Sequence, residues 1–514
     1  MPTDAPLVLG DVPPALPDVV AVARRARPVT LSVSAIAHMA ASRGIVEQLA
    51  ASSTPVYGIS TGFGALANRE IDVDQRVALQ RSVVRSHAAG MGDVVDTEIV
   101  RALMLLRAKT LASGHAGARP LVAEAICSLL NAGITPVVYE YGSLGCSGDL
   151  APLAHCALTL LGEGEAHDAA GRRAPSAGLL AAAGLAPIEL EAKEGLSLIN
   201  GTDGMLGMLV LACTDLGHLL RLSDLAAAMS TEALFCTDQA FRPELVALRP
   251  QPGQALSADN LFRILAGSAI VASHRAEDTR VQDAYSVRCA PQVNGAARDT
   301  LAHARTVATY ELASAIDNPV VLEDGTVASN GNFHGAPLAM VLDFLAIAAA
   351  DVGSIAERRT DRLLDRTRSH GLPAFLAHDP GVDSGLMIAQ YTQAALVSEN
   401  KRLASPASVD SIPSSGMQED HVAMGWSAGL KLRRSLENLR RIVAIELTVA
   451  ARGLALRAPL DPAPATAAAL RILEPLTGPP GPDRFTSPEL AAVEASLVGD
   501  ELLRAVESVA GPLH

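Results

Sequence analysis

Hydrophobic residues recur at three- and four-residue intervals along most of this chain, a spacing that predicts α-helices. The clearest run forms an apolar stripe along one face of a single helix and consists of Leu432, Leu436, Leu439, Val443, Leu447 and Ala450. A stripe of this kind is typical of a buried core or of a subunit interface. The same period covers about residues 75–135 and dominates from residue 200 onward.

Three segments depart from the helical pattern. Residues 1–30 are predicted to be an N-terminal lead-in to the helical part. Residues 163–195 are mixed, with a turn near Gly171 and room for one or two short strands. Residues 458–485 are rich in Pro and Gly, which predicts a connection before a last short helix over roughly residues 488–509.

We therefore expect an all-α fold, a long-helix bundle with a mixed N-terminal region and few short strands. Aromatic residues make up only 3% of the 514 residues, and their scarcity favours close-packed helices over a β-sandwich. Residues 1–200 are expected to form the N-terminal region. Residues 201–514 are expected to form a central helical bundle with C-terminal helices, intertwined with the first region in one unit.

The charge pattern excludes two classes of protein. The net charge is −14 and no basic stripe is present, so a nucleic-acid-binding protein is not expected. A membrane span needs about 18 uncharged residues. The apolar stretches are too short for one because they are interrupted or bounded by Asp215, His218, Arg221, Asp224, Asp343 and Asp351.

The cysteines and the N-terminus both indicate a cytoplasmic protein. The six cysteines match no zinc-site spacing and are expected to be free thiols in a reducing compartment: Cys127, Cys146, Cys156, Cys213, Cys236 and Cys289. The first residues, from Met1 to Asp4, are acidic and lack the basic region of a signal peptide.

Three short motifs carry weaker alternatives. The glycines of residues 142–148 lack the Gly-Lys-Ser/Thr ending of a phosphate-binding loop. Ser398 and Lys401 fit the Ser-x-x-Lys pattern of some serine acylases, without its companion motifs. Residues 414–417 are similar to the flexible loop of the fumarase and aspartase group. The Lys and Asn expected after that loop are absent, so this group remains a weaker alternative.

Residues 141–155 hold the most informative pattern in the chain. They combine three glycines, two serines and an aspartate ahead of a helix whose first turn suits Pro152. Asp149 suits the N-cap of that helix. A cap does not explain Cys146-Ser147-Gly148 inside a glycine-flanked turn, so the turn itself needs a chemical reason.

The stretch resembles the signature of the aromatic amino-acid ammonia-lyase family, in which an Xaa-Ser-Gly segment cyclises into a methylideneimidazolone. The backbone nitrogen of Gly148 would attack the carbonyl of Cys146, a contact that a residue without Cβ allows. Ser147 would lose its hydroxyl as water and leave an exocyclic methylene. Cys146 would keep its side chain as a spectator and is not expected to act as a nucleophile. The resemblance implies 4-methylidene-imidazol-5-one as the cofactor, with no metal, pyridoxal phosphate or nucleotide.

The resemblance continues in the family's order over about residues 57–421. It begins at the glycine-rich loop of residues 57–64 and ends at Gln418-Glu419-Asp420-His421, with Asp317-Asn318-Pro319 between them. Besides Cys146, Ser147 and Gly148, which we call the electrophile loop, the residues that it places at the active site are Tyr57, Asn200, Gln282, Tyr285, Arg288, Phe333 and Glu419.

The resemblance also implies roles for these side chains. The methylene would take the substrate amine and make it a better leaving group, and Tyr57 would remove the β-proton. A phenol has a pKa near 10, so the surroundings of Tyr57 are expected to favour its ionisation. Arg288 would bind the carboxylate with a bidentate fork. Asn200, Tyr285 and Gln282 would position the electrophile's oxygen and the amine.

Three polar residues predict the substrate. In the family, the pair after the glycine-loop segment lines the side-chain pocket, and Ser86-His87 is the pair of the enzymes that act on histidine. Glu419 stands where phenylalanine and tyrosine enzymes usually have glutamine. Imidazole needs a donor and an acceptor, which His87 and Glu419 would supply. We expect L-histidine to be converted to trans-urocanate and ammonia.

Several alternatives remain open. Within the family they are a tyrosine or phenylalanine ammonia-lyase and an aromatic aminomutase. From another class, a non-catalytic helical oligomer is disfavoured because Ser147 and Tyr57 are both present. The resemblance further implies a homotetramer with shared active sites, for which the stripe from Leu432 to Ala450 is a candidate subunit contact.

Overall fold

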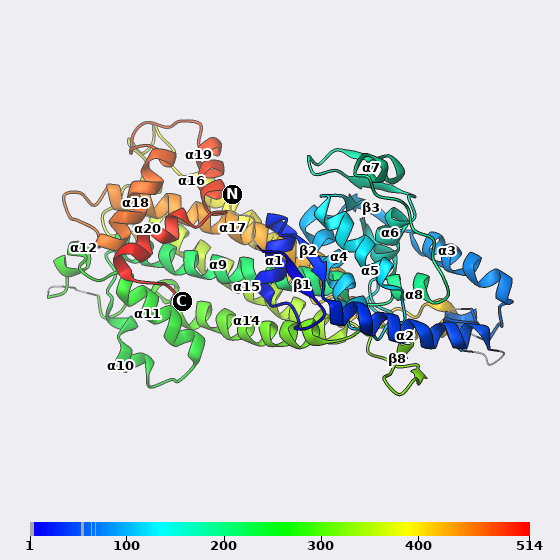
Figure 1. Cartoon of the computed structure of the whole chain (residues 1–514). Coiled ribbons are helices and arrows are strands. Elements are labelled where there is room, and N and C mark those ends of the chain that lie inside the picture. The colour runs from blue at the N-terminus through cyan, green and yellow to red at the C-terminus, as the bar shows by residue number, and fades with distance from the viewer. Residues whose placement is uncertain (1–4, 53–55, 63, 67, 277, 279) are drawn as a thin grey trace. The chain divides into compact units, whose positions relative to one another are not determined.

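The computed structural model describes residues 5–52, 56–62, 64–66, 68–276, 278 and 280–514 (Figure 1). The N-terminal residues Met1 to Asp4, and Phe63 of the glycine-rich loop, lie outside the described residues. The chain divides into two compact units. Unit 1 comprises Met1–Leu211, Ala304–Asp343 and Pro406–Leu430, and unit 2 comprises Ala212–His303, Phe344–Ser405 and Lys431–His514.

Four long helices contribute residues to both units: α9 (Asp203–Ala233), α14 (Ala290–Ala313), α15 (Ala336–Leu364) and α17 (Gly425–Ala455). The strands among the described residues are two to four residues long and pair into small sheets of two or three strands. The expected all-α fold with few short strands is thus confirmed.

Unit 1 holds the N-terminal helices and the strands. Its helices are α1 (Leu16–Arg25), α2 (Val33–Ala51), α3 (Arg76–His87), α4 (Thr97–Ala112), α5 (Pro120–Asn131), α6 (Leu150–Leu160), α7 (Ser176–Ala182) and α8 (Glu194–Ile199), with 3-10 turns η1 (Gly64–Leu66), η2 (Val73–Gln75) and η5 (Ser415–Met417). Its strands are β1 (Leu7–Leu9), β2 (Val29–Leu31), β3 (Met91–Val94), β4 (Thr135–Pro136), β5 (Tyr139–Tyr141), β6 (Glu165–His167), β7 (Arg173–Pro175), β8 (Val320–Val321) and β9 (Val327–Ala328).

Packing in unit 1 joins the helices that flank three of the predicted site segments. Helix α4 packs against α1 and α5, and in a second group α3, α6 and α8 pack against one another (Figure 1). Helix α3 ends at His87, α6 begins directly after Asp149, and α8 ends directly before Asn200. The second group therefore positions three of the predicted site segments.

Unit 2 is helical apart from its loops. Besides the long helices it contains η3 (Gln239–Phe241), α10 (Pro243–Val246), α11 (Pro252–Ile264), α12 (Ala269–Ser273), α13 (Tyr285–Arg288), η4 (Ala374–Leu376), α16 (Met387–Leu403), α18 (Pro464–Thr477), α19 (Ser487–Ser496) and α20 (Glu501–Ala510).

Three sequence expectations about local structure are wrong. Residues 1–30 contain α1 and the parallel pair β1–β2 rather than a simple lead-in. The expected connection at residues 458–485 contains α18, which starts with Pro464 at a position where proline is tolerated and buries an Ala- and Leu-rich face. The last helix is two helices, α19 and α20. For α1 and α18, burial of an apolar face outweighed the local Pro content. The break between α19 and α20 falls at residues 497–500, which include Gly499.

The apolar stripe on α17 lies in the core. None of its six residues is more than 4% exposed. On the same helix, Ile442 packs with Ala356 of α15 and Val397 of α16 in a buried cluster of unit 2. The stripe from Leu432 to Ala450 is therefore covered within the chain, and the expectation that it forms a subunit contact is wrong.

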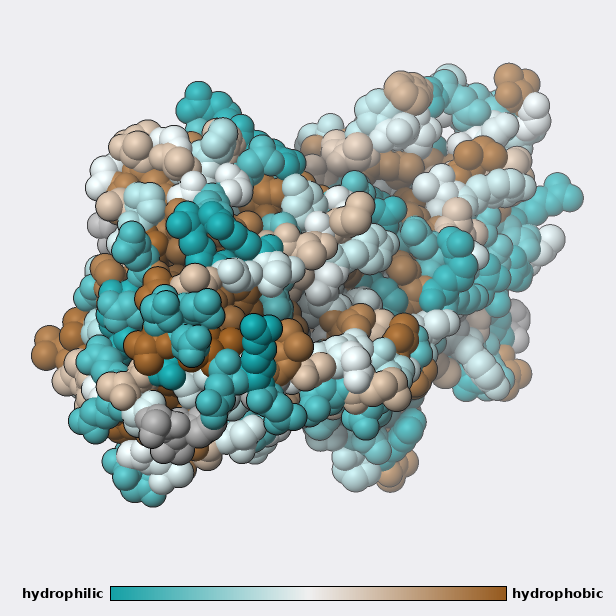
Figure 2. All heavy atoms as spheres, turned by 90° about the vertical axis from the view of Figure 1, so that its right-hand side faces the viewer, coloured by the Kyte–Doolittle hydropathy of each residue, from teal (hydrophilic) through white to brown (hydrophobic). Residues whose placement is uncertain are grey.

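Two helices, α9 and α15, are long and apolar enough to pass a length-and-composition test for membrane spans. In their most apolar windows, 72% and 61% of the residues are buried inside the protein. Core helices pass the same test, so it is weak evidence for a membrane span. On the face shown in Figure 2, hydrophobic residues (brown) and hydrophilic residues (teal) are interspersed.

Candidate active site

The loop of Cys146, Ser147 and Gly148 is closed against the segment that follows α8. Gly148 forms a bridge with Gly201 and has φ of +75°. A Cβ on Gly148 would lie 2.1 Å from the carbonyl oxygen of Gly201. Only glycine fits a position with both a left-handed φ and such a close backbone neighbour.

Asp149 anchors the loop to the first turn of α9. Its Oδ2 accepts hydrogen bonds from the backbone N–H groups of Gly204 and Met205, at 2.9 Å each, and its Oδ1 accepts from Ser143 Oγ at 2.9 Å. It makes no side-chain cap to α6, so the cap suggested by the sequence is not formed. Complete burial raises the pKa of Asp149 to about 7.

Asn200 connects the loop to a second chain segment. Ser147 Oγ donates to Asn200 Oδ1 at 3.3 Å, and Asn200 Nδ2 donates to the backbone oxygen of Asn318 at 2.9 Å. The predicted proximity of Asn200 to Ser147 is therefore present in unit 1. The orientation of the Asn200 side chain is determined by its hydrogen bond to the backbone oxygen of Asn318.

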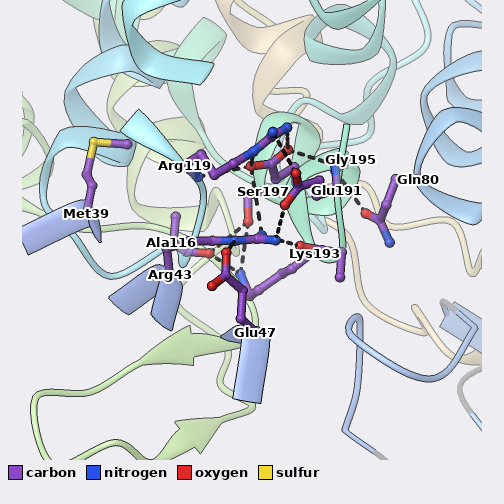
Figure 3. A network of polar contacts seen from close by, with 12 residues as sticks. Met39, Arg43, Glu47, Gln80, Ala116, Arg119, Glu191, Lys193, Gly195 and Ser197 are labelled. Atoms are coloured by element: carbon purple, nitrogen blue, oxygen red, sulfur yellow. Dashed lines mark hydrogen bonds and ion pairs between the residues drawn. The ribbon is translucent and has the colours of Figure 1, made fainter. Parts of the chain in front are cut away.

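A buried ion pair fixes that second segment (Figure 3). Lys193 is fully buried, and its Nζ donates to Asp317 Oδ2 at 2.6 Å, to Ser197 Oγ at 3.0 Å and to the backbone oxygen of Ala116 at 2.7 Å. Burial lowers the pKa of Lys193, and the carboxylate of Asp317 opposes this effect. The pair links the residue before α8 to the residue before Asn318.

A second set of charges surrounds the start of α8 in Figure 3. The buried carboxylate of Glu194 pairs with Arg119 at 2.7 Å, and Glu191 pairs with Arg119 at 2.8 Å and with Arg43 at 2.6 Å. The backbone N–H of Gly195 donates to the side chain of Gln80 at 2.9 Å. Helix α8 is thus held from several sides, which fixes Asn200 at its end.

Lys193→Met is expected to lower the free energy of unfolding by about 3–5 kcal/mol, because it leaves Asp317 buried without its ionic partner. Denaturant unfolding of the purified protein measures the change. The double variant Lys193→Met/Asp317→Leu should recover part of the loss. The control Arg85→Met removes one side of an exposed pair with Glu163 and should change stability little. Equal stability of the Lys193→Met and unsubstituted proteins would contradict this prediction.

His87 is the last residue of α3, and its ring nitrogen Nδ1 is hydrogen-bonded within that helix. Its Nδ1 is 2.9 Å from the backbone oxygen of Val83 and 3.1 Å from Ser86 Oγ. A carbonyl can only accept, so Nδ1 is assigned the proton and Nε2 is an acceptor. Burial lowers the pKa of His87, which favours this neutral ring.

Glu419 reaches the electrophile loop from another part of unit 1. Its Oε2 accepts from Cys146 Sγ at 3.0 Å and from Ser414 Oγ at 3.1 Å. The charge of Glu419 acts on both His87 and Tyr57, whose pKa values it raises. Three other residues predicted for the site, namely Cys146, His87 and Tyr57, therefore lie within electrostatic reach of Glu419.

Tyr57 has surroundings opposite to those expected. Its hydroxyl accepts from the backbone N–H of Gly64 at 3.3 Å, which favours ionisation. Burial outweighs this contact and raises the pKa of Tyr57, and the carboxylates of Glu419 and Asp317 raise it further. The expectation that these surroundings favour the phenolate is wrong for unit 1, because burial and negative charge both disfavour a second anion.

Phe333 is half-buried in the loop before α15. Two residues later, the N–H of Gly335 donates to the oxygen of Gly145 at 2.9 Å, so this loop adjoins the electrophile loop. Contact of Phe333 with the substrate remains a prediction.

The three remaining predicted residues belong to unit 2. Gln282 is exposed, and Tyr285 is 71% exposed. The guanidinium carbon of Arg288 lies 4.6 Å from the ring centre of Tyr285. Arg288 Nε is buried without a hydrogen-bond partner among the described residues. An unpartnered buried N–H of this kind suits a ligand carboxylate.

The residues present fit the implied methylideneimidazolone. The tight turn at Gly148 excludes a side chain, and Ser147 Oγ contacts Asn200 rather than the backbone of its own loop. Asn200 would hold the group from one side.

Lys193 was not predicted from the sequence, and Asp317 was predicted only as part of a motif, with no role of its own. A lysine directly before the Glu194-Gly195 motif was the only signal, and its partner is 124 positions away.

Comparisons with known proteins agree with this arrangement. The family model described as aromatic amino acid lyase matches residues 15–475. The chain is 65% identical to a histidine ammonia-lyase of Streptomyces griseus over 499 residues, covering 96% of this chain and 97% of that one. It is also similar to the solved structures of a tyrosine aminomutase from Streptomyces globisporus (TM-score 0.93, 37% identity, 99% of this chain and 100% of that chain) and of a histidine ammonia-lyase from Trypanosoma cruzi (TM-score 0.90, 36% identity, 98% and 95%). The chain belongs to the aromatic amino acid lyase family.

Proposed function

We propose that this protein converts L-histidine to trans-urocanate and ammonia with a methylideneimidazolone formed from Cys146, Ser147 and Gly148. The observation that carries the proposal is the closure of this loop on Asn200 and Gly201. Glu419 contacts the same loop. The similarity to histidine ammonia-lyase of Streptomyces griseus supports histidine as the substrate.

The mechanism assigns separate tasks to the side chains. The methylideneimidazolone, which the loop of Cys146, Ser147 and Gly148 would form, would supply an electrophilic methylene that makes the substrate amine a better leaving group. Tyr57 accepts the β-proton at its hydroxyl oxygen. Arg288 binds the carboxylate, which would pair its buried Nε. Asn200, together with Tyr285 and Gln282, orients the electrophile and the amine.

His87 and Glu419 recognise the imidazole ring. With Nδ1 committed to Val83, His87 offers an acceptor at Nε2. Glu419 also offers an acceptor. The pair therefore differs from the expected donor and acceptor and suits a partly protonated ring better than a neutral one.

Product analysis tests the proposal directly. The purified enzyme with L-histidine should form urocanate, detected by its absorbance and mass, together with an equal amount of ammonia. The likeness to a tyrosine aminomutase gives a second candidate, a tyrosine-converting enzyme. A β-amino acid formed from tyrosine without release of ammonia would favour that candidate and reject histidine elimination.

Activity is expected to rise with pH between about 7 and 9, because the ionised fraction of a group below its pKa rises tenfold per pH unit. Burial raises the pKa of Tyr57, which moves this rise to higher pH. The difference in phenolate absorbance between the unsubstituted enzyme and Tyr57→Phe, followed during a pH titration, measures the ionisation itself. Ionisation of Tyr57 below pH 7 would contradict the expectation.

We also propose a homotetramer in which one chain's unit 1 works with Gln282, Tyr285 and Arg288 from another chain. The exposure of Tyr285 in the single chain supports a site completed by a partner. In unit 2, a groove of about 530 Å³ between α14 and α15 includes the exposed side chains of Phe344 and Ile347, and it is a candidate contact surface.

Light scattering of the active enzyme should give four times the mass of one chain. A mixture of inactive Ser147→Ala and inactive Arg288→Ala proteins should regain activity after they are unfolded and refolded together, because some sites would then combine two intact parts. A fully active monomer would overturn the shared-site proposal.

A cytoplasmic location is likewise proposed. The six cysteines are unpaired in the structure, which is usual for proteins kept in a reducing compartment.

A further inference from the structure

The first residue of the electrophile loop makes a contact that the ring-forming chemistry does not require. Cys146 Sγ donates to Glu419 Oε2 at 3.0 Å across 273 positions of sequence, and Cys146 is 5% exposed. Ring formation needs only the backbone carbonyl of Cys146. Its side chain is therefore available for another task.

The thiol is suited to donate and not to react. Burial, together with the hydrogen bond to Glu419 and the negative charge of that carboxylate, raises the pKa of Cys146 to about 12. Near neutral pH the group remains S–H, which donates weakly. It cannot compete as a nucleophile because the thiolate is the reactive form.

The other contacts of Glu419 show what the thiol adds. The backbone of Glu419 pairs with that of Ser414 through two hydrogen bonds, at 2.9 and 3.3 Å, so the position of its Cα is fixed. The carboxylate is oriented by Ser414 Oγ and Cys146 Sγ, which both donate to Oε2. Oε1 makes no hydrogen bond with any described residue.

We propose that Cys146 is a positioning residue for substrate recognition, whose thiol holds Oε2 of Glu419 so that Oε1 accepts a hydrogen bond from the substrate's imidazole ring. This inference rests on the proposed function. A carboxylate already held by two donors loses less side-chain freedom when the ring binds. An apolar residue at position 146 would leave the carboxylate held by Ser414 alone.

Binding without turnover tests the inference apart from the electrophile. In the Ser147→Ala background, calorimetry measures the Kd of L-histidine for three further variants. Cys146→Ala should raise Kd about three- to tenfold, the effect of one lost hydrogen bond. Cys146→Ser keeps a donor and should restore most of the affinity. Cys127→Ala, which changes another buried cysteine of unit 1, should leave Kd unchanged.

Kinetics with Ser147 in place give a second readout. Cys146→Ala should raise KM for L-histidine by a similar factor, with kcat changed less than about twofold. The mass of the protein should still be lower than its sequence by two waters. In the Glu419→Gln background, Cys146→Ala should have no further effect on KM, because the acceptor that it holds is already altered.

Three results would overturn the inference. The first is that replacing Cys146 by Ala leaves both Kd and KM for L-histidine unchanged. The second is an effect of Cys146→Ala that adds fully to that of Glu419→Gln. The third is incomplete loss of water in Cys146→Ala, which would place the role of Cys146 in ring formation. If the Ser147→Ala protein does not bind L-histidine measurably, the KM comparison decides. An unsubstituted enzyme that forms no urocanate rejects the proposed function, and this inference with it.

Discussion

Ser147→Ala is expected to yield a folded protein that has lost activity on L-histidine by on the order of 10⁴-fold or more. Enzymes accelerate reactions by about 10⁶-fold or more, and most of that acceleration here would depend on the electrophile that only Ser147 can form. The hydroxyl of Ser147 hydrogen-bonds only to Asn200 among the described residues, so its loss should change stability little.

Intact-protein mass spectrometry provides the chemical evidence for this result. The unsubstituted protein should weigh two waters less than its sequence, with the deficit in a peptide containing Ser147, and Ser147→Ala should have lost at most one water. Ser128→Ala on α5 is the matched control and should keep both the deficit and the activity, because among the described residues the Ser128 hydroxyl bonds only to the backbone oxygen of Glu124. A full sequence mass in fully active enzyme would exclude the methylideneimidazolone.

The second large effect concerns substrate choice. L-histidine should be preferred over L-phenylalanine in kcat/KM by on the order of 10⁴, because an apolar ring would leave Nε2 of His87 and Oε1 of Glu419 without a partner in the complex. Glu419→Gln should lower kcat/KM for L-histidine by about 10- to 150-fold, the effect of losing a hydrogen bond to a charged group. His87→Phe should act in the same direction.

Steady-state kinetics with histidine, tyrosine and phenylalanine measure these ratios side by side. Tyr57→Phe is the informative control, because loss of the base should lower kcat/KM for all three substrates alike. His87→Phe and Glu419→Gln should lower kcat/KM for histidine selectively. A preference of the unsubstituted enzyme for tyrosine would reject the substrate and leave the family unaffected.

Much of the site could be predicted because its chemistry is local in sequence. The proposed ring formation would join the carbonyl of Cys146 to the nitrogen of Gly148 across one residue, so three consecutive residues are enough to predict the reaction. The helical fold was also predictable, because a three- and four-residue period reports which face of a helix is apolar.

The same period could not say what covers that face. The stripe on α17 is buried inside the chain, although its pattern was equally typical of a subunit contact. Likewise, α18 formed in a segment whose Pro and Gly content indicated a connection, because packing of its apolar face outweighed local propensity.

By itself, therefore, the sequence determined the family and the helical architecture and predicted the electrophile loop, all of which depend on residues near one another in the chain. Tertiary structure alone decided whether the pKa of Tyr57 is raised or lowered, the tautomer assigned to His87, and the partners of Cys146 and Lys193. The physical reason is that desolvation and charge act over a few ångströms of space. Glu419 and Asp317 act on Tyr57 from positions far along the chain, so the sequence around residue 57 does not indicate the negative charge that they add.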